Sequence, residues 1–294
     1  MKLCRFNAGA LTNRLGVLQG ERIVDVTSVY QLLDAQRYPL PQHDLFIAAL
    51  PTLLPTITQA LQAIPGATSF ALGDVHFLAP VANPGKIMGA PINYQAHIDE
   101  SKADDGIKHG RTITGIGDWG IFLKANSSLI GVSEEIVLRF PARRNDHEIE
   151  LGIVIGSSCN QVKSADAMQY VAGYMTCLDM TVRGTEFQCF RKSIDTYSVA
   201  GPWFVTADEI ANPGDLALWL QVNGQDRQRA RTSQLIYDIP RLIEFASSFY
   251  TLNAGDIIMT GTPEGVGPVV PGDVIDAGVE GVGTLRMRVA AQYV

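Results

Sequence analysis

The segment of residues 146–156 constrains the fold most strongly, because it carries two charges directly into an apolar run. It reads Asp-His-Glu-Ile-Glu-Leu-Gly-Ile-Val-Ile-Gly, which predicts a strand that enters a core. Side chains on a strand alternate between faces, so Glu148 and Glu150 are expected to point the same way. Like charges at the mouth of a buried strand repel, and a hard cation with oxygen ligands would neutralise them. Two solvated carboxylates at a strand end are the alternative.

Composition narrows the class of protein. With 294 residues, 46% of them hydrophobic and 18% charged, the chain suits one large globular domain or a large and a small one. A net charge of -7 without a basic run argues against nucleic acid and anionic membranes as partners. We expect no signal peptide and no membrane span, because no apolar run approaches the ~20 residues that a span needs.

The cysteines indicate a reducing compartment. None of them forms a Cys-x-x-Cys pair, which predicts buried free thiols in a cytoplasmic protein and argues against a catalytic cysteine. The four are Cys4, Cys159, Cys177 and Cys189.

The Pro/Gly-rich joint of residues 77–86 predicts a boundary between a small N-terminal module, residues 1–75, and a larger domain, residues 80–294. In the module, short extended pieces predict a small antiparallel sheet, and residues 45–64 are helical in composition. Pro51 and Pro55 are expected to break or kink that helix. The module contains no motif with chemistry, so we expect it to serve packing or to support a dimer.

The larger domain is predicted to be mostly β. Asn223-Gly224 is a hairpin signal, residues 239–249 form an amphipathic helix, and residues 101–118 are polar and Gly-rich, typical of a lid or a disordered segment. The absence of βαβ alternation argues against Rossmann and TIM-barrel folds. The prediction is an α+β, β-rich roll. Strands are expected at residues 87–90, 121–124, 136–138, 148–155, 170–179, 203–206, 216–222, 256–260, 273–277 and 282–289, and a second helix near 164–169.

A third acidic residue would complete a metal site. Asp179 follows the apolar run 171–178 at a strand end, where it either caps a turn or faces a site. With three carboxylates, Mg²⁺ would keep several positions open for water or substrate. Arg183, four residues later, offers a forked donor suited to a substrate carboxylate, although a surface Arg–Asp pair is the simpler interpretation.

Two further groups could carry chemistry. His97 and Glu100 share a face if their segment is helical, and a carboxylate beside an imidazole makes a general base near neutral pH. Such a pair is more often structural than catalytic. Lys192 could stabilise an oxyanion or enolate, or be an ordinary surface lysine.

Residues 260–268 form a Gly-rich loop after a strand, Thr-Gly-Thr-Pro-Glu-Gly-Val-Gly-Pro. The loop lacks the Gly-Lys-Ser/Thr of a P-loop, which argues against nucleotide binding. Its backbone N–H groups and the Thr262 hydroxyl could hold a carboxylate instead.

The motifs occur in an order that resembles the fumarylacetoacetate hydrolase family over residues 85–290. The ordered set is far more specific than any one member of it. It consists of Asn93-Tyr94-x-x-His97-x-x-Glu100, Phe122-Leu123-Lys124, residues 147–156, Leu178-Asp179-Met180-Thr181-x-Arg183, Lys192-Ser193 and residues 260–268.

The resemblance implies a mixed β-roll catalytic domain that binds Mg²⁺ or Mn²⁺, usually as a homodimer. Family members often carry a neutral polar residue where Glu186 stands, and the lid is of unfamiliar composition, so the substrate is not fixed by the resemblance. By position it implies Glu148, Glu150 and Asp179 as metal ligands, His97 and Glu100 as a water-activating dyad, Lys192 as a catalytic cation, and Arg183, Thr262, Tyr94 and Gly261 as substrate contacts.

The function expected from these residues is hydrolysis of a C–C bond in a 1,3-diketo acid, such as an acylpyruvate or fumarylpyruvate, in the catabolism of aromatic or related acids. A keto-acid decarboxylase or an isomerase of an unsaturated diacid would use the same site. A non-catalytic protein that binds a small acid is a third possibility. A glycosidase is excluded, because carboxylates on one strand face cannot flank a glycosidic bond.

Overall fold

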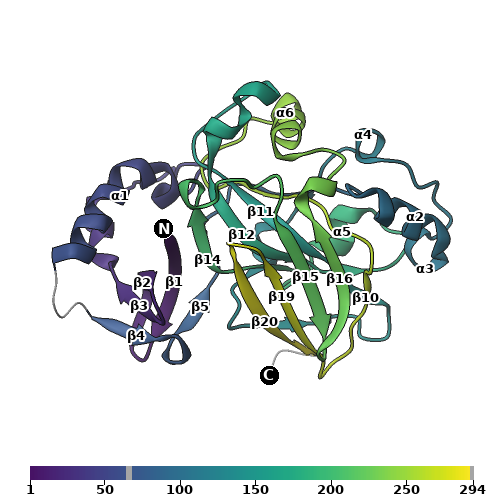
Figure 1. Cartoon of the computed structure of the whole chain (residues 1–294), viewed down its shortest axis with the longest axis horizontal. Helices are drawn as coiled ribbons and strands as arrows, with labels where there is room; N and C mark the ends of the chain where they lie inside the picture. The colour runs from purple at the N-terminus through teal and green to yellow at the C-terminus, as the bar shows by residue number, and fades with distance from the viewer. Residues whose placement is uncertain (64–67, 292–294) are drawn as a thin grey trace.

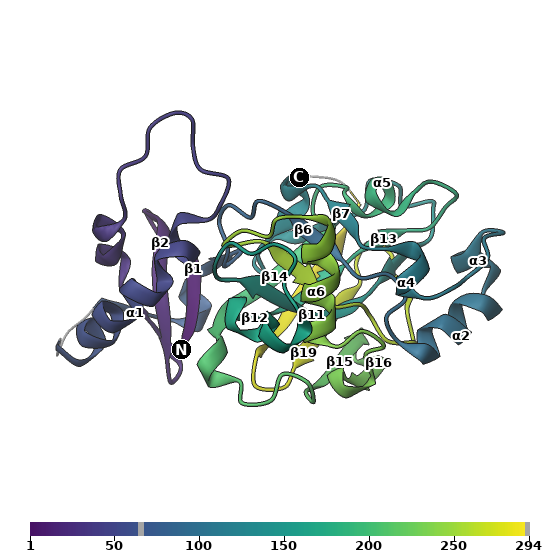
Figure 2. The same ribbon diagram turned by 90° about the horizontal axis from the view of Figure 1, so that it is seen from above.

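The computed structural model describes residues 1–63 and 68–291, and shows a small N-terminal part beside a larger β-rich body (Figures 1 and 2). The expected α+β, β-rich class is confirmed. The largest sheet has 12 strands, in the order β4 (Ser69–Ala71), β3 (Arg22–Asp25), β2 (Leu11–Gln19), β1 (Lys2–Ala8), β14 (Ser198–Thr206), β12 (Val171–Asp179), β11 (Ile149–Ile155), β17 (Ile257–Met259), β6 (Ile87–Gly89) and β7 (Phe122–Lys124), with β5 (His76–Leu78) paired to β1 and β8 (Leu129–Ile130) paired to β14.

Two smaller sheets complete the body. Apolar side chains of the five-stranded sheet, such as Leu220 and Ile275, share a buried core with Leu151 of β11. The five-stranded sheet has the order β16 (Gln225–Arg231), β15 (Ala217–Val222), β19 (Val274–Val279), β20 (Gly283–Ala290) and β9 (Glu135–Val137), and the three-stranded sheet has the order β13 (Thr181–Val182), β10 (Asn145–His147) and β18 (Gly267–Pro268).

The β15–β16 hairpin turns at Asn223 and Gly224, both with positive φ (53° and 74°), as the sequence predicts. Strand β16 itself was not predicted, because its sequence is almost wholly polar. Within it, Gln228 is the residue that is fully buried. This side chain reaches the functional site described below.

The α-helices are few and short, apart from the first and the last. Helix α6 matches the predicted residues 239–249, and Asp238 caps it by accepting a hydrogen bond from the N–H of Arg241 (2.9 Å). The α-helices are α1 (Leu45–Ala63), α2 (Gln95–Ala103), α3 (Asp105–Lys108), α4 (Ile116–Trp119), α5 (Gln188–Lys192) and α6 (Ile239–Phe249); 3₁₀ helices occupy Thr27–Leu32, Leu72–Asp74, Asn126–Ser128, Ser164–Tyr170, Ala207–Glu209 and Thr232–Gln234.

Helix α1 is continuous, so Pro51 and Pro55 do not break it, and the other expected outcome, a kink, stays a prediction. Pro51 and Pro55 lie on its exposed side, where water can solvate the carbonyls that they leave unpaired, while Ile47, Leu53 and Ile57 pack into the core. By length and composition alone, α1 could also cross a membrane, with a mean hydropathy of 1.3 over Leu45–Gln62. The expected helix end at Ile64 and the last three residues of the expected C-terminal domain lie outside the described residues.

Residues 146–156, predicted as one strand, belong to two strands. Residues Asn145–His147 pair within the three-stranded sheet, and Ile149–Ile155 pair within the 12-stranded sheet, so Glu148 lies where the chain changes sheets. Strands β12 and β17 both run antiparallel to β11. The C-terminal ends of both therefore lie at the N-terminal end of β11, which gathers Asp179 and the Gly-rich loop beside Glu150.

The predicted lid is ordered and helical in the described structure. It consists of α2, α3 and α4, which lie together at the edge of the molecule farthest from the N-terminal module (Figure 2). The lid buries three of its own side chains, those of Ile107, Ile113 and Ile116. The sequence pattern hides this packing, because these isoleucines are isolated among polar and glycine residues.

Candidate active site

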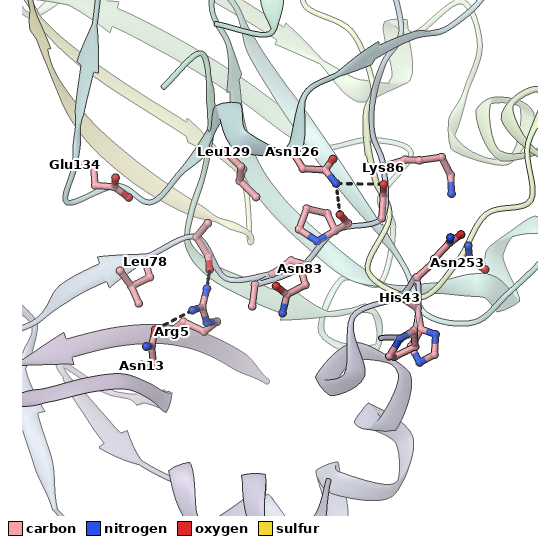
Figure 3. A pocket seen from close by; sticks show the side chains of 17 residues that line it. Arg5, Asn13, His43, Leu78, Asn83, Lys86, Asn126, Leu129, Glu134 and Asn253 are labelled. Carbon is pink, nitrogen blue, oxygen red and sulfur yellow. Dashed lines mark hydrogen bonds between the residues drawn. The ribbon is translucent and has the colours of Figure 1, made fainter. Parts of the chain in front are cut away.

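Two cavities of the described structure could be the functional site, and the smaller one contains the residues that the sequence singled out. The larger, of about 770 Å³, lies between the N-terminal strands and the Pro/Gly-rich joint (Figure 3). Among its described cations, Lys86 pairs with Asp256 (2.7 Å), and Arg5 donates to the carbonyl of Ala79 (3.0 Å). The second cavity, of about 50 Å³, contains the predicted chemistry and shares no described lining residue with the first.

Three carboxylates converge on the second cavity, as predicted. Ligand atoms of Glu148, Glu150 and Asp179 all lie within 4.8 Å of one another, and all three side chains are buried. Burial, together with the neighbouring charges of Asp179 and Glu148, raises the pKa of Glu150 well above its usual range. A buried cluster of carboxylate oxygens fits a hard divalent cation, and the donor set contains neither imidazole nor thiolate.

Two buried lysines surround the same carboxylates. Lys192 Nζ donates to Glu148 and Asp179, each at 2.6 Å, and to the hydroxyl of Thr181 (2.6 Å). Burial opposes its charge, but Asp179 and Glu148 outweigh burial, so the pKa of Lys192 is raised. Lys124 on β7 donates to Asp179 and to the carbonyl of Tyr197, and burial lowers its pKa.

Arg183 binds carboxylates of the chain itself. Its Nε donates to Asp146 (2.7 Å), and a terminal nitrogen donates to Glu148 (2.9 Å). The simpler interpretation, a surface Arg–Asp pair, is wrong about the location, because Arg183 pairs with Asp146 in a buried position. Although burial acts in the opposite sense, the charges of Lys192 and Arg183 hold the pKa of Glu148 low, at about 2. Asp146 thus holds the Arg183 guanidinium beside the carboxylate cluster and is a neighbour of the cluster rather than a member of it.

His97 and Glu100 form the predicted pair on α2. The Nδ1 of His97 lies 2.8 Å from Glu100 Oε2, and the second oxygen of Glu100 accepts the N–H of Gly265 (2.9 Å). A carboxylate partner places the proton on Nδ1 and leaves Nε2 as the basic nitrogen. His97 lines the cavity, so the lid helix carries a base that is tied through Glu100 to the Gly-rich loop.

The remaining predicted contacts separate into two groups. Thr262 lines the cavity, whereas Gly261 and Tyr94 lie behind its described wall. Gly261 donates its N–H to Glu150 (2.6 Å) at a φ of +99°, where a Cβ would meet the Cβ of Asn93 at 2.8 Å. The Tyr94 ring is buried, and burial raises the pKa of its hydroxyl. Their geometry supports the shape of the site rather than contact with a substrate.

Gln228 joins two segments of the site, although the sequence contains no signal for it. Its Oε1 accepts the N–H of Ile149 (3.1 Å), between two of the clustered glutamates, and lies 3.2 Å from His147 Nδ1. Its Nε2 donates to Thr262 Oγ1 (2.8 Å) and to the carbonyl of Pro263 (2.9 Å). One amide thus holds the start of β11 against the Gly-rich loop.

Comparison with known proteins decides the family. The model named "Fumarylacetoacetate (FAA) hydrolase C-terminal" matches residues 86–290, which include every clustered residue described above. The chain belongs to the fumarylacetoacetate hydrolase family. The resemblance drawn from the ordered motifs is confirmed.

Relatives within the family have more than one named activity. Maleylpyruvate hydrolase of Aquipseudomonas alcaligenes is 50% identical over 98% of this chain and 99% of its own length. Mitochondrial oxaloacetate tautomerase of Homo sapiens is 41% identical over 58% of this chain and 80% of its own length. A crystal structure of maleylpyruvate hydrolase from Sphingobium sp. SYK-6, with manganese(II) and pyruvate, matches all of both chains with a TM-score of 0.83 and 39% identity.

Proposed function

We propose that the protein is a divalent-metal-dependent hydrolase that cleaves a C–C bond in a 1,3-diketo acid of the acylpyruvate class. The observation that carries the proposal is the convergence of the buried carboxylate cluster, the His97–Glu100 pair and Lys192 on one cavity. Full-length similarity to a maleylpyruvate hydrolase, and to a maleylpyruvate hydrolase structure in complex with manganese(II) and pyruvate, supports the same class of substrate.

Glu148, Glu150 and Asp179 would hold Mg²⁺ or Mn²⁺. When bound, the cation supplies Lewis-acid stabilisation for the carboxylate and adjacent keto oxygen of the substrate. Glu148 and Asp179 would then have to share their oxygens between the cation and Lys192, whose ammonium now bonds both. Lys192 is thereby placed beside any negative charge that develops at the keto oxygen.

The residues of the chain account for the proton transfers. Glu100 orients His97, whose Nε2 takes a proton from water as the water oxygen bonds to the distal carbonyl carbon. The C–C bond to the methylene then breaks, the former acyl group leaves as a carboxylic acid, and the enolate of pyruvate takes the proton that His97 Nε2 removed from water, which gives pyruvate. Lys192 would stabilise the charge that develops at the keto oxygen, and Arg183 would stabilise the fixed charge of the substrate carboxylate. Both cations bond Glu148 in the structure.

Substrate entry requires the lid to move. The described cavity of about 50 Å³ is far smaller than the ~300 Å³ at the lower end of small-molecule sites. Because His97 and Ser101 on α2 form part of its wall, opening α2–α4 would admit substrate, and closing them would exclude bulk water.

The test is a product panel with and without metal. Fumarylpyruvate, acetylpyruvate and oxaloacetate would be incubated with the protein and the products followed by NMR. We expect metal-dependent release of pyruvate and the matching acid from the diketo acids. Decarboxylation or tautomerisation of oxaloacetate without cleavage of either diketo acid would refute the hydrolase assignment.

The organisation of the protein is part of the same proposal. Residues 1–75 would form the N-terminal module and 80–294 the metal-binding catalytic domain, which is supported by the family match at 86–290. We propose a homodimer in the cytoplasm, acting in the catabolism of aromatic or related acids. Size-exclusion chromatography with light scattering would test the dimer.

A further inference from the structure

Two guanidinium groups line the site cavity without a carboxylate partner in the described chain. They are Arg191, on α5, and Arg111, between α3 and α4 of the lid. Three nearby guanidiniums each bond a carboxylate of the chain. They are those of Arg183, Arg143 and Arg144. Arg191 and Arg111 are therefore the guanidiniums at this site whose charge the protein itself leaves unneutralised.

Arg191 is buried, with 4% of its surface exposed, yet it bonds only backbone oxygens. Its Nε donates to the carbonyl of Glu186 (2.8 Å) and NH1 to that of Val182 (3.1 Å). Carbonyls fix the orientation of a guanidinium but neutralise no charge, and burying an unpaired cation is unfavourable. Of its five N–H donors, these two bonds use two, which leaves donors for a ligand.

Arg111 lies beside Arg191 through a shared acceptor. Its NH2 also donates to the carbonyl of Glu186 (2.8 Å), and to the carbonyls of Gly184 and Thr185. Two cations that meet at one carbonyl repel each other. Burial and the charges of Arg183 and Arg111 lower the pKa of Arg191 to about 10, so it stays charged at neutral pH. An anion between the two would offset this repulsion.

We propose that Arg191 and Arg111 form a subsite for a second carboxylate, at the end of the substrate remote from its 2-keto acid group. The inference rests on the proposed function, which places the keto-acid end at the carboxylate cluster and Lys192. It assigns the substrate as a dioxo dicarboxylate rather than a monocarboxylate. The fork of a guanidinium matches a carboxylate with two parallel hydrogen bonds. Because Arg111 belongs to the lid, the second carboxylate also links the lid to α5.

The direct test uses two keto acids of equal chain length that cannot be cleaved, 2-oxoheptanedioate and 2-oxoheptanoate. Their affinities for the full-length, Mn²⁺-loaded protein would be measured by calorimetry. We expect the diacid to bind at least about tenfold more tightly than the monoacid. Arg191→Met and Arg111→Met should each remove most of that advantage while changing monoacid affinity less than about twofold, and Arg191→Lys should restore part of it.

Arg241→Met is the matched control, because this guanidinium pairs with Glu244 (2.7 Å) and lies outside the cavity lining. It should leave both affinities unchanged. Equal affinity of the natural protein for the two acids would overturn the subsite, and so would an equal loss of both acids in Arg191→Met. If Arg191→Met does not fold, Arg111→Met gives the same decision from a partly exposed position.

Turnover separates this inference from the proposed function. Arg191→Met should raise the KM for fumarylpyruvate about tenfold with kcat little changed, whereas Arg241→Met should leave both constants unaltered. If the natural protein cleaves acetylpyruvate as well as fumarylpyruvate, the subsite is wrong while the hydrolase assignment stands. If it cleaves neither, the hydrolase assignment fails, and the ratio of the two calorimetric affinities still decides the subsite.

Discussion

Replacing Gln228 with Met removes one buried amide while keeping the length and volume of the side chain. The change tests whether this single residue fixes the Gly-rich loop against the strand that carries the clustered glutamates. In the structure the amide accepts the N–H of Ile149 (3.1 Å) and donates to the carbonyl of Pro263 (2.9 Å) and to Thr262 (2.8 Å). Gln228 is 1% exposed, so water cannot take its place without a rearrangement.

The expected cost follows from the groups left unpaired. Loss of the amide strands a backbone N–H and a backbone carbonyl in a buried region, at about 1–3 kcal/mol each. The Thr262 hydroxyl accepts from Gln228 and so loses one donor, but its own O–H is unaffected and the loss adds little. We therefore expect Gln228→Met to lower the free energy of unfolding by about 2–6 kcal/mol. Gln228→Glu should also be destabilising, because it keeps the acceptor for Ile149 but buries a charge near Glu148 and loses the donor to Pro263.

Urea unfolding followed by circular dichroism would measure this cost. Gln221→Met is the matched control, since Gln221 lies on the neighbouring strand β15 and its amide bonds the exposed Asp226 (2.7 Å). The control should change stability by less than about 0.5 kcal/mol. A loss below about 1 kcal/mol in Gln228→Met would refute the reasoning, because it would mean that the backbone groups find other partners.

Three further predictions concern the metal and the base. Mn²⁺ at 100 times its Kd should stabilise the protein by about 2.7 kcal/mol, a chelator should reverse this, and Glu150→Gln should weaken it; calorimetry that shows no effect of Mn²⁺ on melting excludes the metal site. His97→Ala should lower kcat about 10²–10⁴-fold with an unchanged circular dichroism spectrum, and retention of full hydrolysis in that variant would rule out His97 as the base. Lys124→Met should cost about 3–5 kcal/mol without metal, because Asp179 loses a buried cation; urea unfolding with Mn²⁺ should show a smaller loss, and an equal loss in both conditions would contradict the pairing.

The sequence predicted the carboxylate cluster because that cluster depends on local rules. Glu148 and Glu150 precede an apolar run, and Asp179 ends another, and antiparallel pairing brings such ends together. The same reasoning treated residues 148–155 as one strand, whereas Glu148 lies between β10 and β11. The alternation of side chains along a strand shows no change of sheet, so this feature required the tertiary structure.

The residues to which the sequence assigned no role act through contacts distant in the chain. Lys124 is 55 residues from Asp179, and Gln228 is 79 residues from Ile149. Nothing in a polar strand marks which glutamine turns inward, and nothing in Phe-Arg-Lys-Ser marks Arg191 as buried. The continuity of α1 was missed for a related reason. The cost of Pro51 and Pro55 depends on whether the freed carbonyls face solvent, which the sequence leaves open.

The pairing of β1 with β14 has a consequence for any shortened form of the protein. Lys2 and Leu3 pair with Val205 and Phe204, so the first strand covers one border of the catalytic sheet. A chain begun at the Pro/Gly-rich joint would expose a row of unpaired N–H and C=O groups along β14, beside an apolar surface that includes Phe204. Such an open border invites a strand from another molecule. We therefore expect the N-terminal strands to protect this sheet against aggregation, although none of their described residues lines the site cavity.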